Sequence, residues 1–228
     1  MTPLVETARQ LVFGLGVMDQ PTQFTHGGRI LKWRHHGLGM LQAELSEELR
    51  IHIWHPKLVS PGMAWPRCVH DHRFDIWSAV VLGEVIDVSC DVLRDHVAPG
   101  YQPVNIYEIE HAKNQDRLVL DKGCSTATSA LKLSSGSARR TSDEVQAAGR
   151  EYFIPRRTFH TTKVEDLAIT VVHRSNFDER LARVLCALDS DVTAISGIVR
   201  DESLEHRILV NWVLREASDA IAQVERSP

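Results

Sequence analysis

The spacing of apolar residues changes twice along the chain, and the first pattern is helical. Leu4, Ala8 and Leu11 recur at the three-to-four residue interval of one helix face. They follow Thr2 and Pro3, a capping hydroxyl and a proline suited to the first helical position. The sequence therefore predicts an amphipathic helix at the start of the chain.

From Met40 the period becomes two, which is typical of strands whose side chains alternate between two faces. Many short strands at close spacing predict an antiparallel β-barrel or jelly roll. The stretches 56–66 and 134–142 are predicted to be loops, the second one exposed. The predicted strands lie at residues 40–45, 49–54, 69–82, 85–93, 104–110, 117–120, 151–154, 160–164 and 167–173.

After Ser175 the helical spacing returns. Acidic residues near Ser175 favour a helix start, and that helix is expected to run through Leu185. A second helix is predicted at about 203–226, with an apolar stripe on one face. The chain thus divides into a β-barrel domain with its N-terminal helix, residues 1–175, and a helical extension, residues 176–228. The extension is expected to pack on the barrel or to form the contact of a homodimer.

Charge and composition exclude several classes of function. Lys and Arg number 26 against 30 Asp and Glu, a net charge of −4, so a nucleic-acid partner has no electrostatic support. No apolar stretch approaches the roughly 20 residues that span a bilayer, and the N-terminus lacks the pattern of a signal peptide. The 4 cysteines form no C-x-x-C pair. Free thiols in a cytoplasmic protein are the expectation.

Histidines carry the chemical signal of this chain. His70 and His72 are two apart in a predicted strand, so both imidazoles lie on one face. His160 follows the apolar run 152–155 and a turn-like segment, so it can supply a third imidazole from a second strand. Imidazole nitrogen is a common ligand of transition metals. The sequence therefore predicts a three-histidine metal centre inside a β structure.

The spacing of these histidines resembles the two motifs of the cupin superfamily. The first family motif is H-x-H, three or four residues, Glu, six residues and Gly. His70, His72 and Gly83 fit it, but the Glu position falls on Ile76 or Trp77.

The second cupin motif is Gly, five residues, Pro-x-Gly-x-x-His. Gly149, Pro155 and His160 match its spacing, and Arg157 replaces the inner Gly. The resemblance covers roughly residues 40–174 and implies a cupin-type antiparallel barrel. Three-histidine cupins such as cysteine dioxygenase also lack the glutamate, so the resemblance implies a mononuclear Fe(II) dioxygenase.

Three neutral imidazoles leave the charge of a divalent ion uncompensated, which favours anionic ligands. The leading hypothesis is therefore a non-haem iron dioxygenase, an oxidoreductase acting on a small anionic substrate. A second hypothesis is a cupin isomerase, lyase or hydrolase with Zn, Mn or Ni as Lewis acid. A third is a non-catalytic cupin that binds a small molecule.

Other polar residues near the motifs are secondary candidates. Asp75 is a rival metal ligand, although strict alternation points it, like Asp71, away from the histidines. Arg50 and His52 share a strand face that either packs structurally or points into the barrel, with Arg50 as an anion anchor for substrate. Further arginines could bind an anion, and the sequence does not rank them: Arg34, Arg73, Arg156 and Arg174.

Overall fold

The computed structural model describes residues 2–17, 23–59, 65–110, 129–188 and 203–226. The described elements are mostly strands, and α-helices occur near the two ends of the chain. In order they are α1 (Pro3–Phe13), β1 (Gly16–Val17), β2 (Phe24–His26), β3 (Arg29–Ile30), β4 (Arg34–His36), β5 (Leu38–Glu44), β6 (Leu49–Val59), β7 (Asp75–Leu82), β8 (Glu84–Arg94), β9 (Gln102–Glu110), β10 (Ser129–Ala147), β11 (Glu151–Ile154), β12 (His160–Lys163), β13 (Ala168–Ser175), β14 (Ala182–Ala187) and α2 (Leu204–Arg226).

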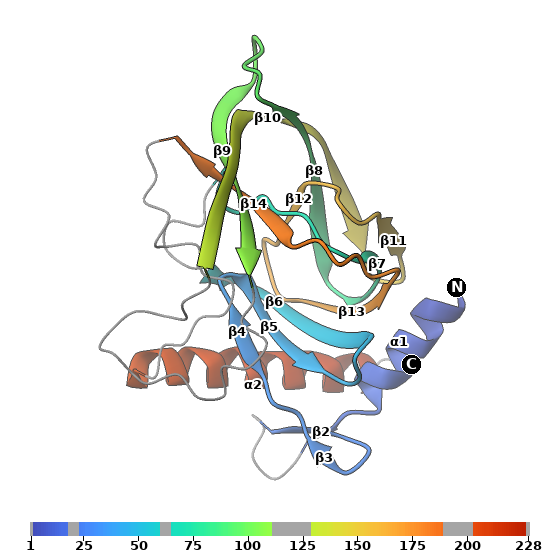
Figure 1. The fold of residues 1–228 in the computed structure, drawn as a ribbon. Helices are drawn as coiled ribbons and strands as arrows, with labels where there is room; N and C mark the ends of the chain where they lie inside the picture. Colours follow the sequence, from blue (N-terminus) through green and yellow to red (C-terminus); the bar gives the residue numbers. More distant parts are fainter. Residues whose placement is uncertain (1, 18–22, 60–64, 111–128, 189–202, 227–228) are drawn as a thin grey trace.

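Two curled antiparallel sheets form the body of the molecule (Figure 1). One has six strands in the order β11-β7-β13-β6-β5-β4, and the other has five in the order β12-β8-β10-β9-β14. Strands β1, β2 and β3 make a small separate sheet. Together the two larger sheets form a half-barrel, so the predicted cupin-like, mainly β fold is confirmed.

The outer face of the six-stranded sheet is apolar and is covered by the helices. Leu41, Ile51 and Val171 are fully buried on this face, in one cluster with Val5 of α1 and Val213 of α2. Alternation turns the next residue of each strand to the opposite face. The half-barrel interior is therefore lined by the alternate positions of these strands, which place polar side chains such as Gln42, His52 and Thr170 beside apolar ones such as Trp54.

The N-terminal helix forms as its sequence predicts. The Thr2 hydroxyl accepts a hydrogen bond from the amide of Val5 at 3.4 Å, and Pro3 occupies the first turn. The helix ends at Gly14, whose amide donates to the Gln10 carbonyl. The predicted helix at 203–226 is also confirmed, as α2.

Two predictions of local structure were wrong. The helix expected from Ser175 through Leu185 is absent: strand β14 occupies 182–187 and pairs with β9. Its apolar run is too short for periodicity to separate a strand from a helix. The exposed loop expected at 134–142 is instead the middle of β10, a central strand between β8 and β9.

The polar sequence of β10 misled the interpretation because one face of this strand is polar: Ser135 and Arg139 are exposed, and the buried Ser137 hydroxyl donates to the His96 carbonyl. On the other face Ala138 is buried, and Gly136 lies so close to β8 that an added Cβ would be 2.2 Å from the Leu93 carbonyl oxygen.

The expected loop at 56–66 also begins later than predicted, because β6 continues to Val59. The predicted strand at 117–120 lies outside the described residues. Within the described part of the chain, the helices are too short or too polar to cross a membrane.

Candidate metal centre

Backbone pairing brings the two histidine motifs side by side. The His70 amide donates to the His160 carbonyl at 3.0 Å, and the His160 amide donates to the His70 carbonyl at 2.9 Å. The strand predicted at 69–82 begins only at Asp75, as β7, so His72 lies outside a strand, but its ring still lies next to the same two imidazoles. The predicted third imidazole therefore does arrive from a second strand, β12.

The three rings converge on a common point. One ring nitrogen from each of His70, His72 and His160 lies within 4.8 Å of the others. The Nε2 atoms of His72 and His160 are 3.1 Å apart. Two nitrogens at ~2.1 Å from one ion, subtending roughly 95°, would be about 3.1 Å apart. The cluster therefore fits one divalent transition-metal ion without rearrangement of this pair.

Hydrogen bonds on the far side of two rings orient them. His160 Nδ1 lies 2.9 Å from the Asp87 carboxylate, and His70 Nδ1 lies 3.1 Å from the Cys68 carbonyl. A proton on each Nδ1 donates to these acceptors and leaves Nε2 unprotonated, as a metal ligand must be. Sequence reasoning missed Asp87, because an acidic residue among the alternating positions of β8 carries no signal of its own.

Burial favours the neutral form of His70 and His72. It lowers the pKa of His70 to about 3, and the neighbouring His160 acts in the same direction. The pKa of His72 also falls well below its ordinary value, through burial and then through the charges of His70 and His160. Neutral imidazoles have free lone pairs, so the site is ready to bind a metal near neutral pH.

Asp71, between the two histidines, is buried rather than directed outward as the sequence predicted. Its backbone amide donates to the Arg183 carbonyl at 2.9 Å, so β14 passes on the side that alternation assigned to solvent. The carboxylate accepts from the Arg183 amide and Nε at 2.5 and 2.7 Å. Only 1% of Asp71 is exposed. This corrects the sequence prediction and reveals an ion pair directly behind the cluster.

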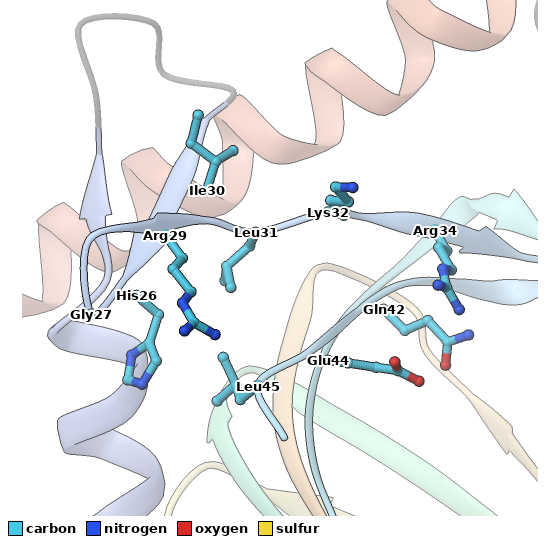
Figure 2. A pocket seen from close by; sticks show the side chains of 10 residues that line it. All are labelled: His26, Gly27, Arg29, Ile30, Leu31, Lys32, Arg34, Gln42, Glu44 and Leu45. Carbon is cyan, nitrogen blue, oxygen red and sulfur yellow. The ribbon is translucent and has the colours of Figure 1, made fainter. Parts of the chain in front are cut away.

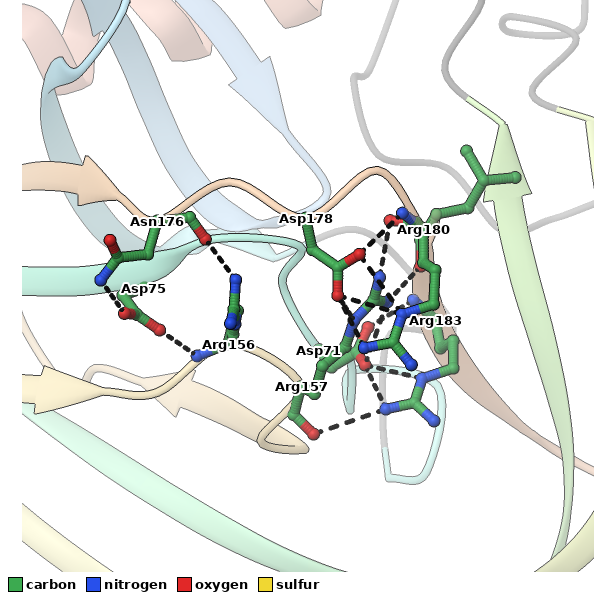
Figure 3. A network of polar contacts seen from close by, with 9 residues as sticks. Asp71, Asp75, Arg156, Arg157, Asn176, Asp178, Arg180 and Arg183 are labelled. Carbon is green, nitrogen blue, oxygen red and sulfur yellow. Dashed lines mark hydrogen bonds and ion pairs between the residues drawn. The ribbon is translucent and has the colours of Figure 1, made fainter.

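Arg157 joins the second histidine motif to the same network (Figure 3). Its amide donates to the His72 carbonyl at 2.9 Å, and its Nε lies 3.2 Å from the Asp178 carboxylate. Its backbone φ is +67°, in the left-handed region where the cupin motif has Gly. The turn before His160 therefore keeps the glycine-like conformation, and the Arg157 side chain anchors it to the segment that leads into β14.

Asp75 is absent from the cluster of potential metal ligands. Its carboxylate accepts from the Arg156 amide and from Asn176 Nδ2, both at 2.7 Å (Figure 3). The Arg156 amide, followed by Asn176, lowers the pKa of Asp75. Its role in this structure is to join the start of β7 to two neighbouring segments.

Arg50 and His52 lie on the inner, polar side of the six-stranded sheet, opposite the apolar face of Ile51 and Ile53. Arg50 forms an ion pair with Glu44 at 2.6 Å. His52 is buried between Gln42 and Thr170 of the adjacent strands, and neither of its ring nitrogens has a hydrogen-bond partner. An unsatisfied buried imidazole on this face favours a polar ligand beside it.

The buried His52 gives a testable pH dependence. Burial, followed by the charges of Arg50 and Arg174, lowers its pKa to about 3. Between the ordinary pKa of a histidine and this lowered pKa, the unfolded chain binds more protons than the folded chain. The free energy of unfolding therefore falls as pH decreases through that range.

We expect His52→Gln to reduce the slope of unfolding free energy against pH by up to about 1.4 kcal/mol per unit. Urea titrations between pH 4 and 7, compared with His96→Gln at an exposed site, measure it. Equal slopes in wild type and His52→Gln would contradict the assignment.

Comparison with known proteins adds little beyond this geometry. No protein-family model matches the chain, and no curated protein matches it. Among solved structures, it is similar to hydroquinone 1,2-dioxygenase from Sphingomonas sp. TTNP3, determined with 4-hydroxybenzoate bound. The identity is 12%, the match covers 60% of this chain and 68% of that one, and the TM-score is 0.26. A similarity at this TM-score carries no argument about function.

Proposed function

We propose that the chain is a mononuclear metal-dependent cupin enzyme, a non-haem iron dioxygenase acting on a small anionic substrate. His70, His72 and His160 are the proposed ligands. The observation that supports this is the convergence of three imidazoles, of which His160 is buried and His70 and His72 are half-buried, without a carboxylate among the described potential ligands. The cupin-like half-barrel around them supports it further.

The charge of the cluster favours ferrous iron with an anionic substrate. Three neutral ligands cancel none of the charge of a divalent ion, and they leave coordination positions open for other molecules. When bound, ferrous iron would supply the redox chemistry that a dioxygenase needs. Asp87 and the Cys68 carbonyl would hold two of the three ligands, His160 and His70, in place.

Arg50 and His52 are the proposed substrate-binding residues. Both lie on the inner face of β6, opposite Ile51 and Ile53 of the apolar cluster. Arg50 would attract the anionic group, and an unpaired ring nitrogen of His52 would donate or accept one hydrogen bond. These two residues bind and orient a ligand, and no proton transfer is assigned to them.

Metal identity separates the dioxygenase from its alternatives. We expect protein loaded with ferrous iron to consume dioxygen in the presence of a suitable small acid, and protein loaded with zinc to consume none.

An anaerobic titration of the ferrous protein with azide, followed spectroscopically, should give the same azide affinity for wild type and for Asp75→Asn. Activity with Zn, Mn or Ni but not iron would favour a Lewis-acid isomerase, lyase or hydrolase. Protein that binds no metal would favour a small-molecule-binding cupin.

Compartment and assembly are further parts of the proposal. A cytoplasmic location is supported by the free thiols of the described Cys68, Cys90 and Cys186. A homodimer contact through α2 is supported by Leu204 and Ile208, whose exposed fractions are 65% and 58%.

A further inference from the structure

A cavity of about 530 Å³ lies between the β2–β3 hairpin and strands β4 and β5 (Figure 2). Its volume is in the range of small-molecule sites. None of the three clustered histidines lines it, so it is separate from the proposed metal centre. Its polar lining residues come from four consecutive parts of the chain: His26, Arg29, Lys32, Arg34, Gln42 and Glu44.

The hairpin turn fixes two of these side chains. Gly27 and Gly28 have φ values of +54° and +75°, the left-handed pair that a two-residue type I′ turn requires. This turn places His26 directly opposite Arg29 in the β2–β3 register. Both side chains therefore lie on the same wall of the cavity, as Figure 2 shows.

The cavity has an excess of positive charge. Arg29, Lys32 and Arg34 make no ion pair with any residue in the described parts of the chain. The one lining carboxylate, Glu44, is already bound by Arg50 at 2.6 Å. Like charges held around a shared cavity repel one another unless an anion lies between them. The cavity is therefore complementary to an anion.

Arg50 extends this positive charge into the wall behind the cavity. It donates to Gln42 and Glu44, both of which line the cavity, while its buried Nε has no hydrogen-bond partner. Burial lowers the pKa of Arg50, and the nearby charge of Arg34 acts in the same direction. An oxyanion at this place would offset that repulsion and offer acceptors to the unpaired donors.

We propose that this cavity is a binding site for a small molecule that carries a phosphate group. Three lining cations make no ion pair with a described residue, and the lining carboxylate of Glu44 is already paired with Arg50, which favours a doubly charged oxyanion over a single carboxylate. One arginine guanidinium group can donate two parallel hydrogen bonds to two oxygens of a phosphate. Arg29 and Arg34 line the cavity from separate strands. The site goes beyond the proposed metal chemistry, and Arg50, which is also a proposed substrate-binding residue, contacts its wall through Gln42 and Glu44 but does not line it.

Calorimetric titration of the full chain with inorganic phosphate tests the site. The protein is treated with a chelator first, because phosphate also binds metal ions. We expect about one phosphate per chain, bound at least tenfold more weakly by Arg29→Gln and by Arg34→Gln. Arg94→Gln, at an exposed arginine of β8, and His72→Ala should bind as wild type does. A parallel titration with glycerol 3-phosphate distinguishes a phosphate ester from the free phosphate ion as the natural ligand. An affinity for glycerol 3-phosphate that equals the affinity for phosphate supports an ester, and a weaker affinity supports the free ion.

Two outcomes would overturn the proposal. One is the absence of phosphate binding by folded wild-type protein at low ionic strength, where such contacts are strongest. The other is binding that survives Arg29→Gln and Arg34→Gln but disappears in His72→Ala, which would place the anion at the histidine cluster. Because the titration uses metal-free protein, the measured phosphate binding does not depend on whether the protein is a dioxygenase.

Discussion

His72→Ala will bind a divalent metal at least about a hundredfold more weakly than the wild-type chain, which should hold about one ion. Two of the three imidazoles remain in this variant, but the Nε2 that lies 3.1 Å from His160 Nε2 is gone. A two-histidine site loses both a bond and the geometric constraint that the third ligand provides. Metal analysis of purified protein, followed by competition titration with a chromophoric chelator, measures the change.

His96→Ala is the matched control, because His96 is an exposed histidine outside the cluster. It should retain wild-type metal content and affinity. Equal metal content in His72→Ala, His160→Ala and His96→Ala would show that the three clustered histidines do not bind the ion, and the dioxygenase proposal would then fail with them.

Most of the strands were predictable, because they depend on local periodicity. Alternation placed His70 and His72 on one side of an extended segment, and the apolar run before Pro155 indicated a second strand leading to His160. That the two segments meet depends on distant pairing and was implied only by the spacing of the cupin motifs, whereas each inference about a single segment is local. The same holds for Thr2, whose capping position follows from the first residues alone.

The surroundings of the cluster were not predictable, because they depend on which strands become neighbours. Asp87 reaches His160 through the pairing of β8 with β12, and Asp71 is buried because β14 lies beside it. The segment that forms β14 was predicted to be helical, so Arg183 could not be recognised as a partner of Asp71. One wrong local assignment therefore concealed the ion pair behind the metal centre.

Asp71→Asn will destabilise the metal-free protein by about 3–5 kcal/mol, because it leaves the mostly buried Arg183 without a counterion. Burial raises the pKa of the Asp71 carboxyl, while the Arg183 charge opposes that effect. An asparagine would keep one oxygen to accept from the Arg183 amide, but its NH2 group would face the Nε donor of Arg183, and this repulsion would disturb the backbone between the two histidines. We therefore expect metal affinity to fall by roughly 10- to 100-fold as well.

Asp75→Asn provides the matched comparison, since it removes the same charge four residues along the chain from a more exposed site. Its partners are the Arg156 amide and the Asn176 amide group, so its loss leaves no buried cation behind. We expect less than about 1 kcal/mol of destabilisation and unchanged metal binding. Urea unfolding of chelator-treated protein separates folding from metal stabilisation. Equal destabilisation by the two substitutions would show that the Asp71–Arg183 pair does not hold the histidine segment against β14, whereas loss of metal in Asp75→Asn alone would make Asp75 the fourth ligand.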